Sequence, residues 1–110
     1  MVKRTAVRGE VWLVSLDPTV GREIRKTRPC MIVSPDEMNR FLATVTAVPL
    51  TSGSANASFR VPVEFKGVVG FLLCDQMRTL DRSRLVKRLG TVQTPTLMAT
   101  LAVLRDMFTE

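Results

Sequence analysis

The sequence predicts a single domain that folds as a small, mostly antiparallel β-barrel with helices packed on its outside. Its 110 residues are the length of one domain, and 45% hydrophobic with 24% charged residues is an ordinary globular mixture. Short apolar, β-branched runs follow one another up to Val92, separated by turn-forming residues. Only the C-terminal stretch has a helical period. Residues 1–110 are therefore expected to form one β-barrel with a C-terminal helix.

The strands are predicted from the apolar runs and the breaks between them. Residues 59–65 alternate in hydropathy but contain Pro62, which lacks a backbone N–H, so this strand is expected at a sheet edge. Residues 51–58 are rich in Ser, Gly and Asn and are expected to form a loop. The full set of expected strands is residues 10–16, 28–33, 44–48, 59–65, 68–74, 77–80 and 85–92.

Two segments predict helices. Ser34 is expected as an N-cap and Pro35 as the first helical residue, with Glu37 completing a capping box. Thr94 and Pro95 repeat the N-cap and proline pair before the second helix. Apolar residues there recur at i, i+4, i+7 and i+11, which is one face of an amphipathic helix: Leu97, Leu101, Leu104 and Phe108.

Residues that are absent exclude several chemistries. The chain has no histidine, which excludes histidine-dependent zinc hydrolases, Ser-His-Asp enzymes and nucleases built on imidazole pairs. No carboxylate cluster suits a divalent ion, so neither a metal nor a cofactor is expected. Cys30 and Cys74 lie in apolar runs and are expected in the core, rather than in a disulfide or a metal site. With no signal peptide and no run of about 20 apolar residues, we expect a cytoplasmic protein without a membrane partner.

The positive charge indicates an anionic partner. The net charge is +6 and the pI is about 10.4, which favours nucleic acid over the alternative of a charge that serves only solubility. A single basic cluster is usually a solvated loop, but this short chain has two. The first cluster is Arg22, Arg25, Lys26 and Arg28; the second is Arg78, Arg82, Arg84, Lys87 and Arg88.

The first basic cluster also holds a carboxylate. Glu23 stands five residues before Arg28, which begins an apolar strand and is thereby held more rigidly than a loop-tip residue. A guanidinium is a planar fork of donors that matches phosphate oxygens and stays charged. Glu23 is either a proton acceptor or one half of an ion pair that shapes the loop. Cations around it lower its pKa, which keeps it ionised but makes it a weaker base.

Two further segments carry polar groups at strand ends. Thr51 and Ser52 precede a glycine, where hydroxyls and backbone N–H groups either bind a phosphate or form an ordinary turn. Asp75 and Gln76 follow an apolar run, where they either bind base edges or complete a turn. With the basic clusters, these groups suit RNA cleavage by its own 2′-hydroxyl, which needs a base, cations on the phosphate and a proton donor, but no metal.

The ordered set of motifs resembles the MazF/PemK (Kid) toxins of bacterial type II toxin–antitoxin modules. It comprises Arg8-Gly9-Glu10-Val11-Trp12-Leu13-Val14-Ser15-Leu16-Asp17-Pro18-Thr19, Gly21, Glu23, Arg28-Pro29, Val48-Pro49-Leu50-Thr51-Ser52-Gly53, Cys74-Asp75-Gln76, Arg78-Thr79 and Lys87-Arg88. The resemblance covers essentially the whole chain, and the sequence around Trp12 and Asp75 is more similar to the PemK/Kid branch.

The resemblance implies an SH3-like barrel shared with CcdB gyrase poisons, and a homodimer that cuts single-stranded RNA at a short sequence. The apolar surplus of residues 97–108 also favours a dimer. It further implies growth inhibition through mRNA cleavage, and a cognate antitoxin whose acidic disordered tail covers the site. By position, Glu23, Arg28 and Thr51 match the family's catalytic residues, with Arg28 assigned to transition-state stabilisation. The expected RNA-binding residues are Arg22, Arg25, Lys26, Ser52, Asp75, Gln76 and Arg78.

Three positions depart from the family pattern. The PemK branch has a histidine where this chain has Arg22, and an arginine two residues before the aspartate where this chain has Leu73. The family's glutamine after the glutamate is Ile24 here. The cut-site preference and the proton donor of that branch therefore do not transfer to this chain.

Two other functions would also account for the positive charge. A CcdB-like poison would bind gyrase through the same barrel, but it would have no use for a phosphate site at Arg28 and Thr51. A non-catalytic nucleic-acid-binding module would need a stacking platform, and aromatic residues are only 5% of this chain, with one Trp and no Tyr.

Overall fold

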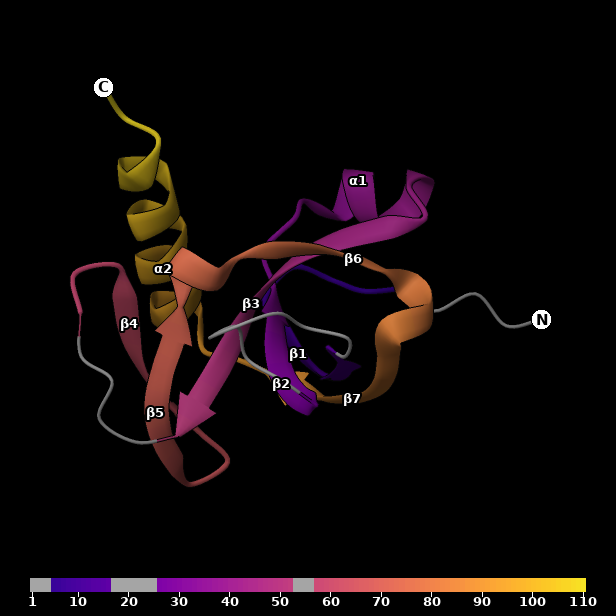
Figure 1. The fold of residues 1–110 in the computed structure, drawn as a ribbon, viewed down its shortest axis with the longest axis horizontal. Coiled ribbons are helices and arrows are strands. Elements are labelled where there is room, and N and C mark those ends of the chain that lie inside the picture. Colours follow the sequence, from indigo (N-terminus) through magenta and orange to yellow (C-terminus); the bar gives the residue numbers. More distant parts are fainter. Residues whose placement is uncertain (1–4, 17–25, 53–56) are drawn as a thin grey trace.

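The computed structural model describes residues 5–16, 26–52 and 57–110, which form a strongly bent antiparallel sheet with two α-helices on its outside (Figure 1). Short 3₁₀ turns η1 (Cys74–Gln76) and η2 (Arg82–Arg84) precede the last two strands. The mostly β barrel with a C-terminal helix is confirmed. Its elements are β1 (Glu10–Ser15), β2 (Thr27–Ile32), α1 (Asp36–Phe41), β3 (Thr44–Ser52), β4 (Arg60–Phe65), β5 (Val68–Leu73), β6 (Arg78–Asp81), β7 (Leu85–Thr91) and α2 (Thr94–Met107).

Strand β3 joins the two halves of the sheet. It is nine residues long, and the strand order is β4-β5-β3-β2-β1-β7, with β6 also paired to β3. Its first half pairs with β2 and β6, and its second half pairs with β5. The loop expected from Thr51 therefore begins too early. Thr51 and Ser52 continue the strand because they pair with Phe71 and Gly70.

Strand β4 lies at the edge of the sheet, as Pro62 predicted. It ends the strand order, and within the described ranges its one partner is β5, where Pro62 faces Phe71. Its alternating burial sends Val61 and Val63 into the core, while Pro62 and Glu64 are exposed. One face of the β4–β5 hairpin is thus core, and the other face is open to solvent.

Two hydrophobic clusters fill the fold. The larger joins residues of all five strands from β1 to β5 with α2, which packs beside β4 (Figure 1). The smaller lies among β1, β2, β6 and β7 and contains Trp12 and Cys30. Cys74 belongs to the larger cluster, and both cysteines are free and buried, as expected. Burial raises the pKa of the Cys30 thiol to about 12 and that of Cys74 to about 11, so both stay protonated and unreactive.

The capping box predicted at Ser34 does not form. The N-cap of α1 is Pro35, with no side-chain cap. The Ser34 hydroxyl instead donates to Oδ1 of the fully buried Asn39 at 2.6 Å and accepts from the Thr46 N–H at 3.0 Å. A buried amide costs free energy unless its groups are hydrogen-bonded, so Asn39 takes the hydroxyl that the cap would have used.

The apolar face of α2 differs from the predicted one at its end. Leu104 is buried, and Leu97 and Leu101 pack against the larger cluster, as predicted. Phe108, however, is 73% exposed just beyond the helix, and Met107 packs there instead. The helix begins at Thr94 with Gln93 as its N-cap, one residue before the predicted cap.

None of the helices in the described ranges is long and apolar enough to cross a bilayer.

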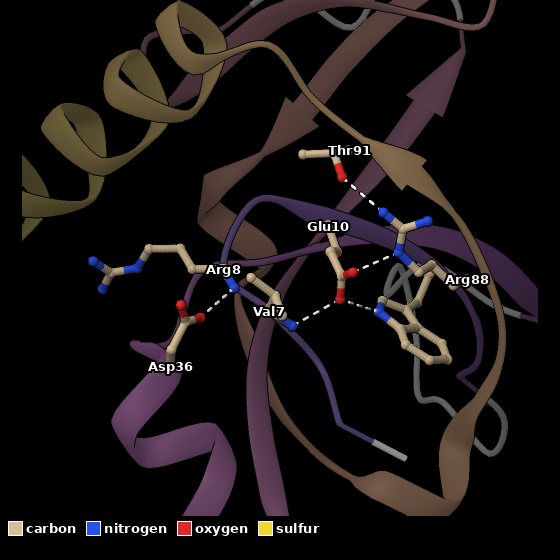
Figure 2. A network of polar contacts seen from close by, with 7 residues as sticks. Val7, Arg8, Glu10, Asp36, Arg88 and Thr91 are labelled. Atoms are coloured by element: carbon tan, nitrogen blue, oxygen red, sulfur yellow. Dashed lines mark hydrogen bonds and ion pairs between the residues drawn. The ribbon is translucent and has the colours of Figure 1, made fainter.

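A buried carboxylate ties the N-terminal segment to β7 (Figure 2). One oxygen of Glu10 accepts from the Val7 N–H at 2.7 Å and from the Trp12 indole N–H at 3.2 Å. Its other oxygen accepts from Nε of Arg88, and Nη2 of Arg88 donates to Thr91 at 3.0 Å. Glu10 is 8% exposed, so these donors compensate for its burial, and Arg88 has a structural role.

Candidate active site

The pairing of β2 with β3 brings the first two candidate residues together. Cys30 lies opposite Pro49, and Arg28 and Thr51 each lie two residues beyond this pair. Because side chains alternate along a strand, Arg28 shares a face with Cys30, and Thr51 shares a face with Pro49. Side chains of directly opposed residues lie on the same face of a sheet. Arg28 is exposed and Thr51 is half-buried. A guanidinium and a hydroxyl, 23 residues apart in the sequence, therefore share one accessible face.

That face continues across β5 and β4. Thr51 lies opposite Phe71, and Phe71 lies opposite Pro62. Because side chains alternate along a strand, Arg60 lies on the same face, two residues before Pro62. We call the surface formed by Arg28, Thr51, Phe71, Pro62 and Arg60 the open face. The other side of these strands carries buried residues: Leu50, Val61, Val63, Gly70 and Leu72.

A cavity of about 350 Å³ lies at the end of β3. Much of its lining comes from apolar residues on the core side of the strands, opposite the open face, including Leu50, Val63 and Phe65, together with Leu89 of β7. Its polar lining residues are Arg28, Thr51, Ser52 and Lys66. The catalytic candidates therefore lie where an apolar hollow meets positively charged residues, an arrangement suited to a ligand that combines an apolar part with an anion.

Gly70 sets how closely β5 approaches Thr51. A Cβ atom at this position would lie 1.8 Å from the Thr51 carbonyl oxygen and 2.8 Å from its carbonyl carbon. Only a residue without a side chain permits this approach of two backbones. Gly70 thus holds the Thr51 backbone in place from the core side of the sheet.

Asp75 is ion-paired. Its Oδ1 accepts from Arg60 Nε at 3.1 Å, and its Oδ2 accepts from Arg60 Nη2 at 3.2 Å. The hydrogen bonds from Arg60 lower the pKa of Asp75 below its usual range, and the same contact raises the pKa of Arg60. Both groups therefore stay charged at neutral pH. Gln76 is half-buried beside this pair in η1.

The remaining predicted RNA-binding residues are spread more widely. Ser52 is exposed opposite Gly70. Lys26 is exposed with a left-handed backbone (φ 65°), and its carbonyl accepts from the Leu16 N–H. Arg78 faces Ala47, four residues back along β3 from Thr51, and its charge acts on the nearby Cys30 thiol. Glu23, Arg22 and Arg25 lie outside the described residues.

Three arginines of the second basic cluster are buried or make polar contacts within the fold. Arg82 is buried in η2, with 8% of its surface exposed. Nη1 of Arg84 donates to the Ser15 carbonyl at 3.0 Å. Arg88 pairs with Glu10 (Figure 2). Arg84 and Arg88 thus link η2 and β7 to β1, which their spacing in the sequence does not reveal.

Comparison with known proteins identifies the family. A family model described as "PemK-like, MazF-like toxin of type II toxin-antitoxin system" matches residues 7–108. The chain belongs to this family. The PemK/MazF-like chain is 46% identical over 91 residues to endoribonuclease PemK of Escherichia coli, covering 77% of this chain and 68% of the relative. It is 33% identical over 88 residues to endoribonuclease MazF of Staphylococcus epidermidis, covering 74% and 73%.

Solved structures agree with the fold of this PemK/MazF-like toxin. MazF (Form-I) from Deinococcus radiodurans superimposes with a TM-score of 0.84 at 27% identity, covering 96% of this chain and 97% of that one. An endoribonuclease in complex with its cognate antitoxin, from a mycobacterial species, gives a TM-score of 0.77 at 26% identity, covering 92% of each chain.

Two cations near the candidate residues, Arg60 and Lys66, were not predicted from the sequence. The contact of Arg60 with Asp75 depends on the pairing of β4 with β5, which the sequence alone does not show. Lys66 lines the cavity from the turn between β4 and β5, where it has a left-handed backbone (φ 50°) and lies 5.9 Å from the Phe65 ring centroid. A signal for Lys66 was present, because the two predicted strands are separated by only Lys66 and Gly67, a spacing typical of a two-residue hairpin.

Gly70→Ala is expected to separate Thr51 from β5 and lower the rate of RNA cleavage by about 10²-fold, as misplacement by about 1 Å can. Gly67→Ala is the matched control. Gly67 has φ +81°, and a Cβ added there would meet no atom of the described residues within 4 Å, so its substitution strains the hairpin without touching Thr51. The measurements are the rate at saturating RNA and the melting temperature of each variant. A folded Gly70→Ala protein with the parent rate would contradict this role.

Proposed function

We propose that this protein is an endoribonuclease toxin that cleaves single-stranded RNA at a short sequence. The observation that carries the proposal is that Arg28 and Thr51 line one cavity of about 350 Å³. The relatives named endoribonuclease PemK and MazF support it. Cleavage of mRNA by such an enzyme would stop translation and growth.

The chemistry that this site suits is attack by the RNA's own 2′-oxygen on the adjacent phosphorus. The 2′-oxygen loses its proton to a base and bonds to phosphorus, and the bond to the 5′-oxygen breaks. A 2′,3′-cyclic phosphate and a 5′-hydroxyl remain. Arg28 stabilises the negative charge that builds on the phosphate oxygens. A guanidinium held in place interacts more strongly with the transition state, where this charge is greatest, than with the bound substrate. Thr51 orients a phosphate oxygen through its hydroxyl.

Glu23 is proposed as the base by its position in the family motif. A carboxylate among cations is a weak base, so its contribution depends on closeness to the 2′-oxygen rather than on a high pKa. No residue is assigned to protonate the 5′-oxygen. Because Arg22 and Leu73 replace the histidine and arginine of the PemK branch, this proton comes from another group or from water.

The antitoxin and the dimer are part of the same proposal. An acidic disordered tail would complement the cations around the cavity, and the mycobacterial relative was solved with its cognate antitoxin. Two apolar side chains at α2 are exposed, Met98 by 58% and Phe108 by 73%, which supports association of two copies in the cytoplasm. Light scattering at micromolar concentration should give the mass of two chains, and the mass of one chain would contradict the proposed homodimer.

Cleavage is expected to continue in EDTA. The proposed base, cation and hydroxyl all come from the protein, so removing divalent ions should leave the rate unchanged within about twofold. The test is a mixed-sequence single-stranded RNA incubated with excess EDTA, followed by mapping of the ends. Activity that disappears in EDTA and returns with magnesium would contradict the proposal.

Arg28→Ala is expected to lower the cleavage rate at saturating RNA by roughly 10²–10³-fold, as for loss of one preorganised donor. Binding of an RNA that lacks the attacking 2′-hydroxyl should weaken much less, because the gain is made in the transition state. Arg28→Lys keeps the charge but loses the planar fork, so most activity should also be lost.

Arg40→Ala is the matched control for Arg28. Arg40 is an exposed arginine in the last turn of α1, before β3 begins, whereas Thr51 lies near the other end of β3. Removal of its charge should leave the cleavage rate at the parent value. If Arg28→Lys cleaved RNA at the parent rate, Arg28 would act only as a point charge and the reacting phosphate would lie elsewhere.

A further inference from the structure

A two-point ion pair holds one arginine at the edge of the open face. Arg60 donates from Nε and from Nη2 to the two oxygens of Asp75, at 3.1 and 3.2 Å. Such bidentate pairs fix the plane of the guanidinium as well as its position. Arg60 begins β4, and Asp75 follows β5 in η1. Because Arg60 lies opposite Leu73, the hairpin itself brings the two charges together.

The register puts this arginine on the same side of the sheet as the catalytic candidates. Thr51, Phe71 and Pro62 are opposed across three neighbouring strands, and Arg60 is two residues from Pro62. Two strand spacings of about 4.8 Å and two residues of about 3.4 Å give a Cα separation of roughly 12 Å between Arg60 and Thr51. Phe71 lies between them and is half-buried.

The pair lies at the surface, where its contribution to folding is small. The Arg60 side chain is 22% exposed and the Asp75 side chain is 39% exposed. Exposed ion pairs add little to stability, so a bidentate contact here does more to orient the guanidinium than to hold the fold. An oriented guanidinium at a solvent-accessible edge can bind a phosphate with little loss of side-chain entropy.

We propose that Arg60 binds a phosphate of the RNA strand next to the one held at Arg28 and Thr51, and that Asp75 positions Arg60 for this contact. This inference rests on the proposed function. It changes the role predicted for Asp75, since each oxygen of this carboxylate already accepts a hydrogen bond from Arg60. Asp75 is a positioning residue, and its effect on RNA passes through Arg60.

The test uses an RNA that carries the mapped cut site with a 2′-deoxy nucleotide in place of the attacking one. Arg60→Ala and Arg60→Gln should each weaken its binding by roughly three- to tenfold, and should flatten the slope of log K against log salt by about 0.7, the loss of one phosphate contact on a single strand. The cleavage rate at saturating RNA should change by less than about threefold, so the effect falls on KM.

Two further variants separate binding from structure. Asp75→Asn keeps the cation but loses its ionic anchor, so binding should weaken while the salt slope stays at the parent value. Arg40→Ala, on α1, should change neither quantity. A purely structural role predicts a lower melting temperature for the Arg60 variants with an unchanged salt slope.

The outcomes distinguish this inference from the proposed function. If the parent cleaves RNA while Arg60→Gln binds it with the parent affinity and salt slope, the inference is wrong and the proposed function stands. If the parent does not cleave any RNA, the proposed function fails whatever Arg60 does. Arg60 variants that bind RNA normally but lose affinity for an acidic peptide would assign Arg60 to antitoxin binding and overturn the RNA contact.

Discussion

The pairing of β3 with β2 on one side and β5 on the other is the constraint on which this structure depends. Each register fixes which residues oppose one another, and a shift of one residue would turn every side chain to the other face. Leu50 lies opposite Leu72, and both of these side chains enter the core. The same alignment leaves Arg28, Thr51 and Phe71 on the open face, so the core and the site are set together.

Burial on one face of the hairpin stabilises the geometry on the other. Burying one aliphatic side chain contributes about 1.5–3 kcal/mol, and Leu50, Val61, Val63 and Leu72 are all buried behind the open face. Gly70 adds no side chain but allows the closest approach of β5 to Thr51. The site residues can therefore stay polar and exposed while the strands that carry them remain rigid.

Local patterns in the sequence predicted the strands, the edge position of β4 and the buried cysteines, because alternation and apolar runs report on burial directly. Features that depend on distant partners could not be predicted in this way. Ser34 satisfies a buried Asn39 and Thr46 rather than a cap, and Arg60 meets Asp75 only through the hairpin. The resemblance supplied Arg28 and Thr51 as catalytic candidates, and the register supplied their common face.

The arginines serve two different purposes in this chain, since Arg84 and Arg88 contact β1 while Arg28 is exposed and lines the cavity. The most direct test of this division is chemical-shift mapping during titration with the RNA that has a 2′-deoxy nucleotide at the cut site. The amides of Thr51 and Phe71 and the Arg60 Nε–H should shift together, with those of Arg84 and Arg88 unmoved. Shifts centred on Arg84 and Arg88, with Thr51 and Phe71 unchanged, would contradict the placement of the site on the open face.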